Sequence, residues 1–132
     1  MKKIAVVLLL AVSISGCATL GDWLPSFWDD NQSAKIIDIR QQVQNISCDT
    51  AEDQRRGAAG LASSIQWFKL YSESKGMLQK DVLRLVEPMD QTVAEWSKRA
   101  ATGEASTGYC KIKKSVLKAQ SDKAATAVLG RY

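Results

Sequence analysis

The sequence contains no histidine, only two prolines and three cysteines among 132 residues. Without histidine the chain cannot form a Ser-His or Cys-His catalytic pair, or a zinc site of the ordinary histidine-containing kind. The Cys-x-x-Cys spacing of redox-active cysteine pairs is also absent. We therefore predict no catalytic residues, no metal site and no cofactor, and we expect that the protein is not an enzyme.

The composition is that of a folded domain, with 45% hydrophobic and 24% charged residues. The net charge of +4 is unevenly distributed along the chain. Residues 22–97 include twelve acidic and eight basic residues, whereas residues 98–132 include two acidic and eight basic ones. This asymmetry suits either the choice of a partner or charge pairing within the domain.

The N-terminus has the organisation of a secretory signal peptide. Lys2 and Lys3 precede an apolar run from Ile4 to Val12, and small residues follow up to Gly16. The apolar run is too short for a transmembrane helix, which needs about 20 residues. We therefore predict a signal peptide at residues 1–16, which leaves a mature chain long enough for one small domain.

The residues Ile14-Ser15-Gly16-Cys17 resemble the lipobox of bacterial lipoproteins, in which an aliphatic residue and two small residues precede a cysteine. The resemblance implies cleavage before Cys17, a thioether-linked lipid on its sulfur, and acylation, as by palmitate, of the new amino group. In Gram-negative lipoproteins an aspartate after the cysteine favours retention in the inner membrane, and this sequence has Ala18 there. For a Gram-negative host, the resemblance thus implies a lipid anchor on the periplasmic face of the outer membrane.

Residues 17–32 are predicted to form a lipidated tether, because Gly21, Pro25 and the polar run at 29–31 are typical of a linker. The tether includes the aromatic residues Trp23, Phe27 and Trp28. Tryptophans this close to a lipid are well placed for the headgroup region of a membrane. The alternative is that these rings fold back and cap the domain, since aromatic side chains serve both purposes.

The apolar pattern of residues 33–132 is helical, with no strand-like alternation. We expect Asp30 or Ser33 to cap a first helix that is interrupted at residues 48–49. Thr50 has the position of the first residue of a capping box, so a second helix should begin there. Gly76 is placed to end this second helix.

A third helix is predicted to end at Gly103, and Pro88 should kink it or split it after Val86. Ser106 can cap a fourth helix over about residues 107–129. Four helices joined by short turns predict the fold class, a small all-α helical bundle behind the tether.

The apolar face of each helix defines the expected core. For the first three helices these faces are Ile36, Ile37, Ile39, Val43 and Ile46; Leu61, Ile65, Phe68 and either Leu70 or Tyr71; and Leu78, Val82, Leu85, Met89, Val93 and Trp96. The fourth helix has a weaker face, for which we expect Ile112, Val116, Ala127 and Val128, with one residue from each of the pairs 119/120 and 123/124. Gly57 and Gly60 either allow close contact between helices or mark a break in the second helix.

Cys48 and Cys110 remain once Cys17 is lipidated. Export to an oxidising compartment favours a disulfide between them. In an up-and-down bundle the end of the first helix and the start of the fourth are neighbours, so both cysteines should lie at one end. Two free buried thiols and an intermolecular bridge are the alternatives.

A cluster of lysines on the fourth helix is the main charged surface feature. Lys111, Lys114 and Lys118 share a helical face, and Lys113 lies beside them. They form a possible surface for an anionic envelope polymer or an acidic envelope protein, whereas nucleic acid is not expected as a partner. An ordinary solvated helix face is the alternative.

These features lead us to expect an envelope lipoprotein that acts as a non-enzymatic interaction or structural module and is held to the membrane through Cys17. A phage-encoded lysis lipoprotein is a second hypothesis, because the outer-membrane subunits of spanins resemble this chain in anchor, size and helical content. The proline-rich stretch of the lambda type is missing here. A small enzyme acting on the cell wall is a third class.

Overall fold

The computed structural model describes residues 28–131, which form four α-helices and a short 3-10 helix with no strand among them. In chain order the elements are α2 (Asp30–Gln44), α3 (Ala51–Ser74), η3 (Met77–Gln79), α4 (Lys80–Ala101) and α5 (Thr107–Leu129). The predicted small all-α bundle is thus confirmed.

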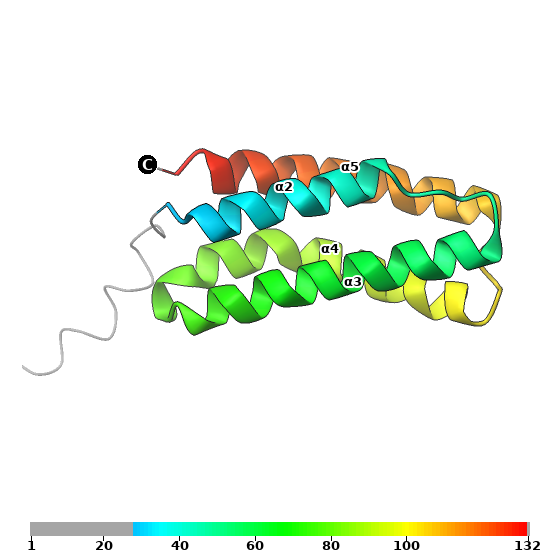
Figure 1. The fold of residues 1–132 in the computed structure, drawn as a ribbon, viewed down its shortest axis with the longest axis horizontal. Coiled ribbons are helices and arrows are strands. Elements are labelled where there is room, and N and C mark those ends of the chain that lie inside the picture. The colour runs from blue at the N-terminus through cyan, green and yellow to red at the C-terminus, as the bar shows by residue number, and fades with distance from the viewer. Residues whose placement is uncertain (1–27, 132) are drawn as a thin grey trace, which may run out of the picture.

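The four helices run up and down in sequence order (Figure 1). Helices α2 and α5 pack together as one pair, α3 and α4 as the other, and the pairs face each other across the core. We call the end at which α2 begins the entry end; α5 finishes there and the α3–α4 connection crosses it. The opposite end, with the α2–α3 and α4–α5 connections, is the disulfide end.

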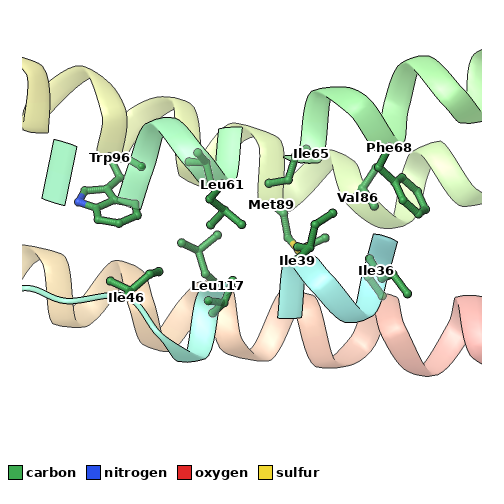
Figure 2. Packing of buried hydrophobic residues seen from close by; sticks show 14 of the residues in the cluster. Ile36, Ile39, Ile46, Leu61, Ile65, Phe68, Val86, Met89, Trp96 and Leu117 are labelled. Carbon is green, nitrogen blue, oxygen red and sulfur yellow. The ribbon is translucent and has the colours of Figure 1, made fainter. Parts of the chain in front are cut away.

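The core runs the length of the bundle between the two helix pairs (Figure 2). Trp96 and Ile46 lie at one end of this view, and Phe68 and Ile36 at the other. Most of the predicted positions on α2, α3 and α4 are buried, as listed by helix: Ile36, Ile39, Val43; Leu61, Ile65, Phe68; Val82, Met89, Val93, Trp96. The helical period of the apolar residues therefore located the core correctly for these three helices.

The predicted apolar face of α5 is confirmed at Ala124 and Val128, which are buried, but it is wrong in the first half of the helix. Ile112 and Val116 are 63% and 40% exposed, while the residues that α5 buries are Cys110, Leu117, Ser121, Ala124, Ala125 and Val128. Most residues of this buried stripe are small, so α5 packs closely against the neighbouring helices and adds few large side chains to the core. The prediction for Ile37 fails in the same way, because this residue is 51% exposed. Of the alternatives Leu70 and Tyr71, Leu70 is 55% exposed and Tyr71 is half-buried.

Pro88 does not split α4, which is continuous from Lys80 to Ala101. A proline deprives the carbonyl four residues earlier of its donor, here that of Arg84. Both Arg84 and Pro88 are exposed, so the carbonyl without a helical donor lies on the side of the helix that water reaches.

Helices α2, α3 and α5 each start directly after a residue whose side chain caps the helix, whereas α4 has no side-chain cap. Thr50 and Ser106 accept backbone hydrogen bonds from Asp53 and Tyr109, as their positions predicted. The cap of α2 is Asp29, not Asp30 or Ser33, and the helix begins at Asp30, so its first turn takes in residues assigned to the tether. Gly76 follows the end of α3 with a φ of +93°, a conformation that favours glycine.

The two glycines within α3 do not break it. A Cβ atom added to Gly57 would lie 3.4 Å from the ring of Trp96, the largest core side chain, which is close to an ordinary contact distance. A Cβ atom on Gly60 would meet nothing within 4 Å.

Candidate functional site

Three of the predicted site residues, Cys17, Trp23 and Phe27, lie outside the described residues. The fourth residue of the tether prediction, Trp28, lies at the entry end with 45% of its surface exposed. Its indole N–H donates to the Asp30 carboxylate over 2.7 Å. The Trp28 ring thus stays at the surface beside the start of α2.

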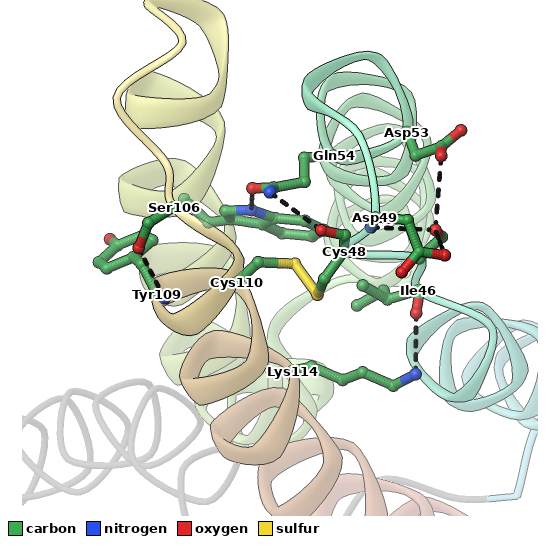
Figure 3. The surroundings of a disulfide bond; sticks show 11 residues. Ile46, Cys48, Asp49, Asp53, Gln54, Ser106, Tyr109, Cys110 and Lys114 are labelled. Atoms are coloured by element: carbon green, nitrogen blue, oxygen red, sulfur yellow. Dashed lines mark hydrogen bonds between the residues drawn. A yellow bond between two sulfur atoms is a disulfide. The ribbon is translucent and has the colours of Figure 1, made fainter.

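Cys48 and Cys110 form a disulfide within the chain, as predicted (Figure 3). Their Cα atoms are 5.7 Å apart, and the bond joins the α2–α3 connection to the first turn of α5. Both residues are buried. The side chain of Gln54 accepts from the Trp96 indole and donates to the Cys48 carbonyl, each over 3.5 Å. Buried sulfurs held by such packing are typical of a structural bond rather than a reactive one.

The lysines of α5 are largely engaged in contacts within the bundle. Lys113 pairs with Glu95 on α4, and this hydrogen bond raises the pKa of the lysine and lowers that of the carboxyl group. Lys114 donates to the Ile46 carbonyl over 2.8 Å (Figure 3).

Lys118 pairs with Asp122 over 2.9 Å, and Asp122 also accepts from Arg40 on α2 over 2.6 Å. Lys111 is exposed beside them. The predicted anionic-partner surface therefore presents less uncompensated positive charge than the sequence suggests.

A cluster at the entry end was not anticipated as a unit. The rings of Trp67 and Tyr71, one turn apart on α3, stack with 5.0 Å between centroids and an interplanar angle of 6°. The ammonium group of Lys35 on α2 lies 5.2 Å from the Trp67 ring, and that of Lys75 lies 5.6 Å from the Tyr71 ring. The i, i+4 spacing of the two aromatic residues is the signal that could have revealed the stack.

Asp29 ties this cluster to the start of α2. Its carboxylate accepts from the Gln32 amide over 2.9 Å and from the Tyr71 hydroxyl over 3.2 Å, and pairs with Lys75 over 2.7 Å. Burial by itself would raise the pKa of this carboxyl group, but the hydrogen bonds from Lys75 and Gln32 together bring it below its ordinary value. The pKa of Lys75 is raised in turn.

The described part of the chain offers neither a metal site nor a membrane-spanning element. Residues 28–131 place no three histidine, cysteine, aspartate or glutamate side chains where they could hold a metal ion. None of the helices in this range combines the length and apolarity needed to cross a bilayer. Comparisons with protein-family models, with curated proteins and with solved structures find no match to this chain.

Proposed function

We propose that the protein is an envelope lipoprotein, anchored through Cys17 to the periplasmic face of the outer membrane of a Gram-negative host, and that its helical domain is a non-enzymatic interaction or structural module. The observation that carries the proposal is the lipobox at residues 14–17, preceded by two lysines and an apolar run. The multiple acyl chains implied by the lipobox would provide a stable anchor without a transmembrane helix.

The disulfide is independent support for export. Disulfides persist in oxidising compartments such as the periplasm and are rare in the cytosol. Of the three cysteines, the two outside the lipobox are those that pair. Because Cys48 and Cys110 are bonded to each other, Cys17 remains available for lipidation.

The decisive experiment compares Cys17→Ser with the unmodified chain, each produced from its own signal sequence. We expect the unmodified chain in the outer-membrane fraction, with a mass that includes the lipid, and the variant either soluble in the periplasm or retained with its signal peptide uncleaved. A Cys48→Ala/Cys110→Ala variant is the matched control and should remain membrane-bound. An unmodified Cys17 thiol in a chain that still begins at Met1 would refute the anchor.

The interaction role is tested by crosslinking in intact envelopes, followed by isolation of the protein and identification of the chains attached to it. If the helical domain is an interaction module, we expect reproducible crosslinks from residues of the bundle surface to one envelope partner. Hydrolysis of purified peptidoglycan by the pure protein would refute the non-enzymatic assignment.

A further inference from the structure

The entry end carries a group of aromatic side chains that are exposed or half-buried. Trp67 is 43% exposed and stacks on Tyr71, whose hydroxyl donates to Asp29, the residue that follows Trp28. Leu70, 55% exposed, lies on α3 between the two stacked residues in sequence. We call Trp28, Trp67, Leu70 and Tyr71 the entry patch. Large apolar side chains gathered at one surface usually mark an interaction site.

We propose that the entry patch seats the bundle in the headgroup layer of the membrane to which Cys17 is attached. This inference rests on the lipid anchor proposed above and goes beyond it. The anchor would hold the protein at the membrane, whereas the entry patch would decide which end of the bundle faces the lipid.

The length of chain between the lipid and the bundle argues for this occupant. Trp28 lies eleven positions after Cys17 in the sequence, so the entry end can be at most about 40 Å from the anchored residue. Helix α3 is itself about 36 Å long, at 1.5 Å per residue for its 24 residues. Such confinement corresponds to an effective concentration in the millimolar range, so weak affinity of the patch for lipid is sufficient.

The chemistry of the entry patch also fits a membrane interface. Tryptophan and tyrosine favour the headgroup region, because their rings are apolar while their N–H and O–H groups stay hydrated or hydrogen-bonded. Lys35 and Lys75 flank the stacked rings, with their ammonium groups over the faces of Trp67 and Tyr71.

The charges at this end largely compensate one another. Lys75 pairs with Asp29, and Lys35 pairs with Asp38 over 2.9 Å. Seating should therefore depend on the aromatic rings more than on net charge, and it should change little with salt concentration.

The test uses the full lipidated protein in vesicles of phosphatidylcholine and phosphatidylethanolamine, with the phosphatidylcholine either unmodified or brominated on the acyl carbons nearest the headgroup. Bromine quenches tryptophan emission on contact. The contribution of Trp67 is the difference between the wild type and Trp67→Phe. The matched control adds Ile112→Trp to Trp67→Phe, which places an indole on the outer face of α5, at a position that is 63% exposed against 43% for Trp67.

We expect brominated lipid to reduce the emission of Trp67 by roughly twofold or more, since an indole at the headgroup boundary contacts the outer acyl carbons. The indole introduced by Ile112→Trp should lose little emission, and both results should persist at high salt. Equal quenching of the two indoles, or none at Trp67, would overturn the proposal. Vesicle flotation tests the lipid anchor separately from the entry patch. If the chain floats only with Cys17 present but shows no quenching, the anchor is supported and the entry-patch proposal is refuted. If the chain does not float, both proposals are refuted.

Discussion

Reduction of the Cys48–Cys110 bond should remove a large part of the stability of the bundle. The bond closes a loop across a sequence separation of 62 residues. In the chain-entropy description, a loop of this length restricts the unfolded chain by about 4 kcal/mol. Domains of this size have total stabilities of about 5–15 kcal/mol.

The measurement is urea unfolding of the full chain carrying Cys17→Ser, followed by tryptophan fluorescence and circular dichroism with and without a thiol reductant. The Cys17→Ser substitution ensures that the reductant acts only on the other two cysteines. A loss of about 4 kcal/mol corresponds to a fall in melting temperature of roughly 15–30 °C for a domain of about 100 residues.

Cys48→Ala/Cys110→Ala provides the matched comparison, because it removes the bond without adding buried polar groups. Both cysteines are buried, so this variant should lose the loop-closure contribution and a smaller amount from the missing sulfur contacts. A loss below about 1 kcal/mol in both experiments would refute the reasoning, since the bond would then not restrict the unfolded chain. Titration of free thiols before reduction should find none.

Three further predictions test the caps and helix faces. Asp29→Asn should keep a capping side chain but lose the charge. Since the pKa of Asp29 is lowered from 3.8, the charge stabilises the folded protein at neutral pH, and this stabilisation is lost as the pH falls below that value. The variant should therefore be less stable than the wild type at pH 7, and its urea stability should fall less between roughly pH 4 and pH 2. Gly60→Ala should raise the free energy of unfolding by about 1 kcal/mol, because the added methyl group meets no atom within 4 Å and alanine favours helix. Leu117→Ala should cost about 2–5 kcal/mol, whereas Ile112→Ser with Val116→Ser should change the stability by no more than about 0.5 kcal/mol.

The contrary results are equally specific. A stability difference for Asp29→Asn that is the same at pH 7 and at pH 2 would mean that the charge contributes nothing. Destabilisation by Gly60→Ala would mean that α3 packs closely at this position. A larger loss from the Ile112 and Val116 substitutions than from Leu117→Ala would mean that α5 is rotated, with its exposed stripe facing the core.

The sequence by itself determined the fold class and most of the architecture. Apolar residues recurring every three or four positions identify helices, and Thr50, Gly76 and Ser106 mark helix boundaries through local hydrogen bonding and backbone geometry. The cysteine pairing also followed, because the connectivity of a four-helix bundle brings Cys48 and Cys110 to one end. These features depend on interactions between residues close in sequence, or on simple topology.

Tertiary structure decided which face α5 buries. Its larger apolar residues Ile112 and Val116 form one stripe, and Cys110 and Leu117 lie on another with small residues. Periodicity alone favoured the bulkier stripe. The disulfide fixes Cys110 inward, and α5 packs against α2 and α4 with the other residues of that stripe buried, so the bulkier stripe faces solvent.

The cap of α2 and the entry patch were likewise beyond local reasoning. Asp29 was one of several adjacent residues able to cap, and it lies where Lys75 and Tyr71 from the end of α3 also contact its carboxylate. Trp67 and Tyr71 become part of a surface with Trp28 only because α3 returns to the point at which α2 begins. Contacts between residues some forty positions apart in sequence exist only once the helices have packed, and that packing is the physical reason the sequence did not reveal them.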